Sequence, residues 1–175
     1  YLFGYFFRGE NGDLADTGDW AFARTDEKQA CETCVEFVMA RWKAFPGLHI
    51  YHYAAYEPSA LKRLMGRYAT REEEIDQMLR AKMFVDLYQV VRHGIRASVE
   101  SYSIKKLEPF YAFGREAALA DANVALANLQ ANLELEDILS ISEEAQATVL
   151  AYNRDDCRSA AGLRDWLEML RAQIV

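Results

Sequence analysis

Apolar residues gather in short runs at several points of the chain, and these runs predict strands. The chain opens on an apolar and aromatic run, which favours a buried strand over residues 1–7. A turn is expected at 10–13, where glycine and acidic residues cluster, and residues 20–23 are expected to form the returning strand of a hairpin. Two later runs, at 48–53 and 83–85, predict short interior strands.

Elsewhere the apolar side chains recur every three or four residues, a spacing that predicts amphipathic helices. The first helix is expected from residue 25 to about 45, where Pro46 and Gly47 follow. The last helix is expected to open at residue 142 and to continue to about 170. The other predicted helices begin at Glu57, span 71–80, follow Asp86 as far as Gly94, and span 104–110 and 121–133.

The order of these elements indicates a mixed α/β fold, with a central sheet flanked by helices. No linker, low-complexity run or internal repeat interrupts the 175 residues, so we expect a single domain over residues 1–175. The opening run resembles the middle of a strand, with no Met and no basic signal-peptide segment ahead of it. We therefore expect the chain to be a piece of a longer protein.

The net charge of −7 argues against indiscriminate binding to the nucleic-acid backbone, which requires a basic surface. It does not exclude a nuclease, because a carboxylate-lined metal site is itself acidic and its bound ions reverse the local sign. Two basic patches occur, one formed by Lys62, Arg63 and Arg67 and one by Lys105 and Lys106. For both patches we favour the interpretation as solvated helix surfaces.

The chain contains no run of about 18 apolar residues, so neither a membrane span nor a membrane partner is expected. Its three cysteines, an odd number, favour a reducing, cytoplasmic setting without a disulfide framework. Cys31 and Cys34 have the spacing of half a zinc site, but no second half-site follows. We interpret them as small residues on a helix.

The most informative segment lies in the last predicted helix, where Tyr152 and Asp156 are four residues apart. Side chains at this spacing project from the same helical face, one turn apart. A carboxylate there is able to hold a divalent ion, and a phenol beside it to orient or deprotonate an attacking water. The spacing alone also occurs on ordinary helix surfaces. Asp155 points about 100° away from Asp156, so we expect it to be solvated or to support the ligands from behind.

Two further acids occupy positions where sites of α/β proteins gather, at strand ends and adjoining helix starts. Glu57 follows the predicted strand 48–53 and opens a helix, where an acid also complements the helix dipole. Asp86 ends the predicted strand 83–85, where an N-cap is the favoured local interpretation. Hydrolysis with two metal ions needs several carboxylates around the ions, so Glu57 and Asp156 alone are too few.

These segments together resemble the DnaQ-like 3′–5′ exonucleases, the DEDD group of the ribonuclease H-like superfamily. More closely, the chain resembles the ribonuclease H-like (YprB-type) domain of bacterial RecB-family nucleases. The segments that carry the resemblance run in the expected order over nearly the whole chain. They are Tyr-Leu-Phe-Gly-Tyr at 1–5, Tyr-His-Tyr-Ala-Ala-Tyr-Glu at 51–57, Phe-Val-Asp-Leu at 84–87, Ser-Tyr-Ser-Ile-Lys-Lys-Leu-Glu at 101–108 and Tyr-Asn-Arg-Asp-Asp at 152–156.

The resemblance assigns the acidic residues to motifs of the family. Tyr152 and Asp156 match the third motif, Tyr-x-x-x-Asp, of the tyrosine (DEDDy) subgroup. Tyr56 and Glu57 stand where the second motif has an aromatic residue followed by Asp, so Glu replaces Asp. The first motif, Asp-x-Glu, is absent; in the family it lies on a strand just before the one that opens this chain. The segment 103–107 resembles a helix start that serves packing rather than catalysis.

By this resemblance the domain is expected to hydrolyse nucleic-acid phosphodiester bonds from a 3′ end, with two Mg²⁺ or Mn²⁺ ions as cofactors. Glu57 and Asp156 are the expected metal ligands, Tyr152 positions the water and Asp86 is peripheral. His52 and Tyr53 are candidates to line the substrate groove, although Tyr53 is better explained as a packed strand residue. The expected partners are DNA or RNA and other domains of the same polypeptide.

Two other hypotheses belong to different classes of function. In one, the domain is a non-catalytic nucleic-acid-binding or interaction module of a larger nuclease or helicase, as the missing first motif and Glu57 suggest. In the other, the domain is purely structural and the Tyr152/Asp156 pair is incidental. The structural hypothesis predicts that Tyr152 packs away from Glu57.

Overall fold

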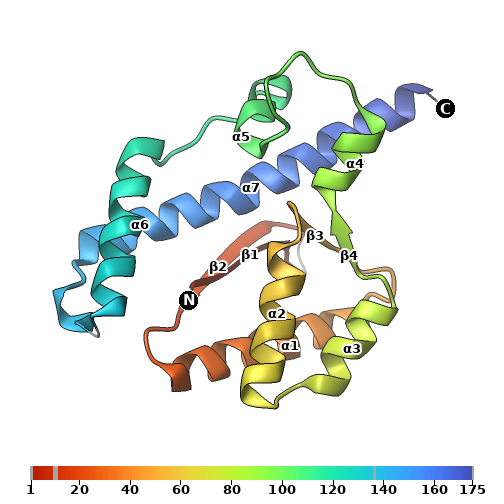
Figure 1. Cartoon of the computed structure of the whole chain (residues 1–175). Coiled ribbons are helices and arrows are strands. Elements are labelled where there is room, and N and C mark those ends of the chain that lie inside the picture. Colours follow the sequence, from red (N-terminus) through yellow and green to blue (C-terminus); the bar gives the residue numbers. More distant parts are fainter. Residues whose placement is uncertain (1, 10–11, 136, 175) are drawn as a thin grey trace.

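The computed structural model describes residues 2–9, 12–135 and 137–174. The long helix α7 (Glu143–Ile174) runs through the molecule, with the strands and α1 to α3 on one side, α5 on the other and α6 crossing its first turns (Figure 1). The mixed α/β class is confirmed, although the chain is mostly helical and its sheets are small.

The hairpin at the start of the chain confirms the first predicted strand and corrects the second. Strand β1 (Leu2–Arg8) pairs antiparallel with β2 (Leu14–Trp20), so the returning strand begins well before the expected 20–23. Beyond the paired residues, Gly9 donates its N–H to the carbonyl of Asp13 at 2.6 Å. Part of the predicted turn, residues 10 and 11, lies outside the described residues.

The second sheet joins the two short strands expected in the interior of the chain. Strand β3 (Ile50–His52) pairs parallel with β4 (Phe84–Asp86), in the register Ile50↔Phe84 to His52↔Asp86. The helices α2 (Tyr56–Tyr68) and α3 (Glu72–Arg80) connect these strands, as predicted. The parallel register brings the ends of both strands, and the residues that follow them, to one edge of the sheet.

The expectation of one central sheet is wrong for the residues that the structure describes, because the strands form two separate two-stranded sheets. Side chains meet the edge of β1 that faces away from β2. The carbonyl of Gly4 accepts a hydrogen bond from Cys157 Sγ at 3.6 Å, and that of Arg8 accepts one from Arg41 at 2.7 Å. A β-carbon on Gly4 would lie 1.6 Å from Asn153 Oδ1, so glycine permits this close approach of α7.

Helix α1 (Arg24–Ala44) confirms the predicted first helix, and the Ala23 N–H before it donates to the Asp26 carboxylate at 3.1 Å. Its Val35 packs against α3 and the start of β4, in one of two buried apolar clusters. The first cluster consists of Val35, Ile75, Met78 and Met83, each at most 2% exposed.

The second apolar cluster joins α7 to two shorter elements, α4 (Leu87–Gly94) and α5 (Ile104–Leu107). Its fully buried members are Leu87, Val91, Leu107 and Leu163. The predicted helix 104–110 is split here into α5 and the 3₁₀ helix η1 (Glu108–Tyr111). This cluster fixes the position of α5 against the middle of α7.

Helix α6 (Leu119–Glu134), the 3₁₀ helix η2 (Ile138–Ser140) and α7 complete the chain. Ser142 begins α7, as predicted, by accepting the Ala145 N–H on its hydroxyl at 3.1 Å. Helix α7 packs against α6, β1, β3, α4 and α5. Its central turns therefore lie among elements from across the chain. None of the described helices combines the length and the apolar character needed to cross a membrane.

Candidate functional site

Tyr152 and Asp156 lie one turn apart near the middle of α7, as their spacing predicts. The hydroxyl of Tyr152 accepts a hydrogen bond from Lys105 Nζ at 2.6 Å. The Oδ1 atom of Asp156 forms an ion pair with Arg115 Nη2 at 2.8 Å, and the carboxylate remains 40% exposed. Both groups predicted on this face are thus held by cations from other segments.

Glu57 lies in the first turn of α2, directly after the end of β3. The backbone between them turns sharply at Ala54, which has a left-handed φ of 65°. His52 Nδ1 lies 3.6 Å from Glu57 Oε2, and half of the glutamate side chain is exposed. Desolvation is the largest cause that raises the pKa of Glu57; its backbone hydrogen bond and His52 oppose this effect.

Glu57 and Asp156 are close enough to interact electrostatically, since the charge of Asp156 is the smallest of the causes that raise the pKa of Glu57. The packing of α7 against β3 accounts for this proximity. The pKa of Asp156 is itself raised, first by desolvation and also by Glu108, while Arg115 and Lys105 act in the opposite direction. The two carboxyls therefore share an environment that disfavours negative charge.

Asp86 is the N-cap of α4, the favoured local interpretation of this residue. Its Oδ1 accepts the N–H of Tyr88 at 2.9 Å and the N–H of Ala54 at 2.9 Å. One carboxylate oxygen thus joins the start of α4 to the loop that precedes Glu57. Asp86 also contributes to raising the pKa of Glu57, which places its charge close to the same region.

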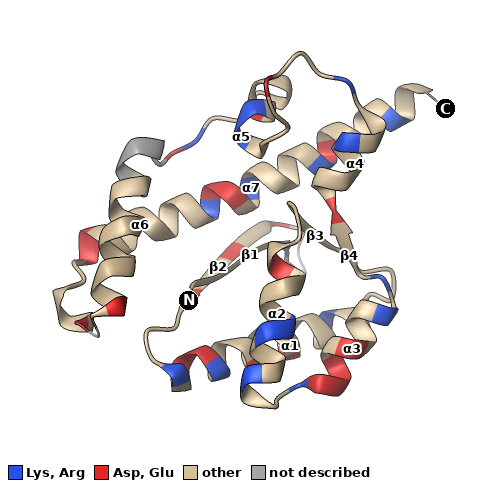
Figure 2. Cartoon of the chain, in the orientation of Figure 1, with Lys and Arg blue, Asp and Glu red and all other residues tan. Residues whose placement is uncertain are grey.

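Lys105 belongs to the site although the sequence assigned its segment to packing and to a solvated surface. Its ammonium lies 4.9 Å from the centroid of the Tyr152 ring, in addition to its hydrogen bond to the hydroxyl. The neighbouring Lys106 behaves as expected, with a side chain 56% exposed and Glu100 at 3.6 Å. Figure 2 shows the basic residues of α5 beside the charged central turns of α7.

Arg115 is the second residue that sequence reasoning missed, because it lies in a loop without a periodic pattern. Its side chain is 8% exposed, and it donates to both oxygens of the equally buried Glu108, through Nε at 3.0 and 3.1 Å and through Nη2 at 2.6 Å. Glu108 also accepts from the hydroxyl of Ser159 at 2.9 Å. Tyr111 in turn lies 2.8 Å from that hydroxyl.

Asp155 is 1% exposed, so of the two roles expected for it the solvated one is wrong and the supporting one remains. Its Oδ2 accepts the backbone N–H groups of Glu116 and Ala117, each at 2.9 Å. These residues directly follow Arg115. Asp155 therefore supports the site indirectly, by anchoring the loop whose guanidinium reaches Asp156.

His52 and Tyr53 are held by contacts within the fold. His52 is 6% exposed, and its Nδ1 lies 2.5 Å from the carbonyl of Ala54. The Tyr53 hydroxyl donates to the carbonyl of Tyr102, and burial raises the pKa of this phenol to about 12. These contacts agree with the interpretation of Tyr53 as a packed residue.

Glu57 and Asp156 supply carboxylate oxygens, the donors that Mg²⁺ prefers in proteins. Across residues 2–9, 12–135 and 137–174, however, no cluster of three or more His, Cys, Asp or Glu side chains has an arrangement suited to a metal ion. The pair therefore has the right chemistry for a divalent ion but too few ligands to hold two. Any such site requires further donors.

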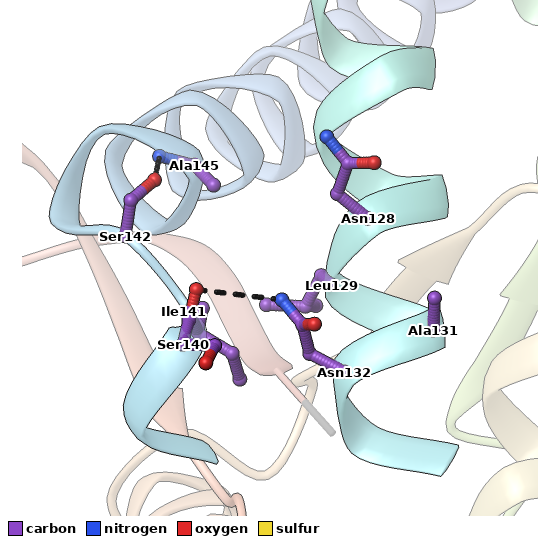
Figure 3. Close-up of a pocket in the computed structure, with 8 residues that line it drawn as sticks. All are labelled: Asn128, Leu129, Ala131, Asn132, Ser140, Ile141, Ser142 and Ala145. Carbon is purple, nitrogen blue, oxygen red and sulfur yellow. Dashed lines mark hydrogen bonds between the residues drawn. The ribbon is translucent and has the colours of Figure 1, made fainter. Parts of the chain in front are cut away.

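A pocket of about 260 Å³ lies elsewhere, between the end of α6 and the start of α7 (Figure 3). Asn132 Nδ2 reaches across it towards the carbonyl of Ser140 at 3.5 Å. The lining contains amide, hydroxyl and apolar groups and no titratable side chain: Asn128, Leu129, Ala131, Asn132, Ser140, Ile141, Ser142 and Ala145. This pocket is therefore separate from the carboxylates and offers no group for hydrolysis.

In a comparison with known protein families, a family model described as the RNase H superfamily matches residues 1–168. All of the candidate residues described above fall within that span. No curated protein and no solved structure matches the chain significantly.

Proposed function

Because the chain belongs to the RNase H superfamily, we propose that it is an exonuclease domain that depends on divalent metal ions. Within the superfamily we assign it to the DnaQ-like exonucleases of the tyrosine (DEDDy) subgroup, close to the YprB-type domain. The proposed reaction is hydrolysis of the terminal phosphodiester bond at the 3′ end of DNA or RNA.

The observation that carries this proposal is the position of Tyr152 and Asp156 on one face of α7, near Glu57 at the start of α2. An incidental helical pair is not expected to share its electrostatic environment with a carboxylate from another segment. The raised pKa values of Glu57 and Asp156 add support, because groups with perturbed pKa values gather at functional sites.

Each residue has a distinct proposed role. Glu57 and Asp156 would hold Mg²⁺ or Mn²⁺, and Asp86 would contribute from the periphery. The ions, when bound, would activate a water and stabilise charge on the leaving oxygen. Tyr152 would orient the water through its hydroxyl. Since Glu57 and Asp156 are too few for two ions, we propose that the Asp-x-Glu motif of the family, on a further strand of the full-length polypeptide, completes the ligands.

The test is cleavage of labelled single-stranded DNA and RNA by the full-length polypeptide with Mg²⁺ or Mn²⁺, with any separate nuclease domain disabled. Asp156→Asn should reduce the rate at least about a hundredfold, because it removes a metal ligand. Asp165→Asn is the matched control, since Asp165 is on the same helix with a side chain 64% exposed. Equal cleavage by the two variants would refute the assignment, and products shortened from the 5′ end would refute the polarity.

A second candidate function is a non-catalytic nucleic-acid-binding or interaction module. Two observations favour it: the described residues contain no three-ligand cluster, and Arg115 already neutralises Asp156. The two functions differ in metal binding by the full-length polypeptide. The exonuclease requires Mn²⁺ to bind with Asp156 as a ligand, whereas the module requires nucleic-acid binding without any metal at this position.

A further inference from the structure

Lys105 stands out because its cationic group is held at the candidate site without a carboxylate partner. Within the described part of the chain its ammonium has no ion pair, and its hydrogen-bond partner is the hydroxyl of Tyr152 at 2.6 Å. Lys106, the next residue on the same short helix, is instead paired with Glu100 at the surface. The site thus retains one positive charge that no neighbouring side chain neutralises directly.

The chemistry of the Lys105–Tyr152 contact fixes the direction of its hydrogen bond. An ammonium group has only donors, so the phenol oxygen must accept. The phenolic hydrogen of Tyr152 is then directed to a different acceptor. Lys105 and Tyr152 therefore present N–H and O–H donors side by side, which is an arrangement that binds an anionic oxygen.

Arg115 increases the positive character of this position. Its guanidinium carbon lies 5.5 Å from the centroid of the Tyr152 ring, so two cations flank one phenol. Its Nη1 atom has no hydrogen-bond partner among the described residues. Arg115 pairs with Asp156 and Glu108, and the Lys105 ammonium lies beside the phenol oxygen. The two cations beside the phenol therefore favour an anionic oxygen at this position, although Asp156, Glu108 and Glu57 belong to the same region.

We propose that Lys105 Nζ and the Tyr152 hydroxyl together bind a non-bridging oxygen of a nucleic-acid phosphate beside Asp156. The inference rests on the proposed nuclease function and specifies how that site takes its substrate. The phenolic hydrogen of Tyr152 then goes to the substrate, so this hydroxyl orients the water only as a hydrogen-bond acceptor and is not a base. Arg115 is a positioning residue, which holds Asp156 and keeps the environment of the phenol positive.

The test measures binding of a short 5′-fluorescein-labelled single-stranded DNA to the full-length polypeptide by fluorescence anisotropy, in EDTA so that no cleavage occurs. Lys105→Met should weaken binding about tenfold, the loss expected for one hydrogen bond to a charged group. It should also reduce the slope of log Kd against log salt by about 0.7, the contribution of one phosphate contact on a single strand. Lys106→Met, the matched control, should change neither quantity.

Tyr152→Phe supplies a second, independent variant, because it keeps the ring and removes the hydroxyl. Tyr152→Phe should weaken binding. The loss of binding free energy in the double variant with Lys105→Met should not exceed the sum of the two single losses, since the two groups hold one oxygen. Thermal unfolding of each variant establishes that it is folded.

The inference is overturned if Lys105→Met and Lys106→Met bind the DNA equally, or if the salt dependence of Lys105→Met is that of the wild type. These results are independent of the cleavage assay. Normal cleavage with equal binding by the two lysine variants rejects the anion-binding pair and leaves the exonuclease proposal intact. If the wild type does not cleave but Lys105→Met alone loses binding, the exonuclease proposal is rejected and the anion-binding pair stands.

Discussion

Nη2 of Arg115 lies 2.6 Å from Glu108 and 2.8 Å from Asp156, so a single guanidinium nitrogen joins a buried carboxylate to a half-exposed one. Glu108 belongs to a network within the fold, and Asp156 belongs to the candidate site. The orientation of the Asp156 carboxylate is therefore coupled to the packing of η1 and α7. Variants at Arg115 and at Asp155 test by their stability whether Glu108 and Asp155 serve the fold.

Arg115→Met is expected to lower the free energy of unfolding by about 3 kcal/mol, because Glu108 would remain buried without its partner. The double variant Arg115→Met/Glu108→Leu should recover most of this loss, since it removes both charges. Urea denaturation measures these differences. Arg158→Met, which breaks an exposed pair with Glu116, is the control and should cost less than about 1 kcal/mol. The prediction would be contradicted if Arg115→Met were at least as stable as Arg115→Met/Glu108→Leu.

Asp155→Ala is expected to destabilise the fold by about 2–4 kcal/mol, because the N–H groups of Glu116 and Ala117 would lose their acceptor. Asp155→Asn should cost less, since its amide oxygen is still able to accept. Asp165→Ala, at an exposed position of the same helix, should stay within about 0.5 kcal/mol of the wild type. If Asp155→Ala and Asp165→Ala unfolded at the same urea concentration, the buried role of Asp155 would be wrong.

The helical periodicity of the sequence was sufficient to predict α7 and the start of α2, and with them the placement of Tyr152, Asp156 and Glu57. These residues could be found because each depends on local rules, the i to i+4 spacing and the position after a strand. Lys105 and Arg115 obey no such rule. They reach the site through contacts with residues of α7 that are distant in the sequence.

The same limit explains why the role of Asp155 was left open between two alternatives and why a single sheet was expected. The helical wheel shows that Asp155 faces away from Asp156, but not that a loop presents two N–H groups on that side. The apolar runs predict strands without specifying what lies at their edges. Whether the other edge of β1 pairs with a further strand or accepts from side chains, as Gly4 does from Cys157, depends on tertiary packing, which the alternation of residues does not encode.

The pH dependence of stability should reveal the raised pKa of Glu57, which desolvation causes first. A carboxyl with a higher pKa in the folded state binds more protons when folded, so its contribution to stability falls as the pH rises through the window above its ordinary value of 4.5. Glu57→Gln is therefore expected to raise the free energy of unfolding at neutral pH, measured with a chelator present, and to have little effect below that window.

Glu143→Gln is the matched control for this measurement, because Glu143 also lies in the first turn of a helix and is exposed. Loss of its favourable interaction with the helix dipole should slightly lower stability at neutral pH. The change in the free energy of unfolding at neutral pH should therefore be positive for Glu57→Gln and negative for Glu143→Gln. Equal losses in both variants at every pH would contradict the account of Glu57.

The cysteines should be unreactive in the folded protein. All three are free thiols, and Cys31 and Cys34 both lie on α1, as interpreted from the sequence. Burial raises the pKa of Cys34 and of Cys157 to about 12. At pH 8 only about one such thiol in ten thousand is the reactive thiolate. Alkylation by iodoacetamide should be slow at Cys34 and Cys157 until urea unfolds the chain; equal rates before and after unfolding would contradict this.

Titration of the full-length polypeptide with Mn²⁺ tests most directly whether Glu57 and Asp156 serve a common cation site. We predict that the wild type binds two Mn²⁺ ions and that Glu57→Gln and Asp156→Asn each weaken or abolish binding of at least one ion, while Asp165→Asn binds as the wild type does. Binding by Glu57→Gln and Asp156→Asn that is indistinguishable from that of Asp165→Asn would contradict the account.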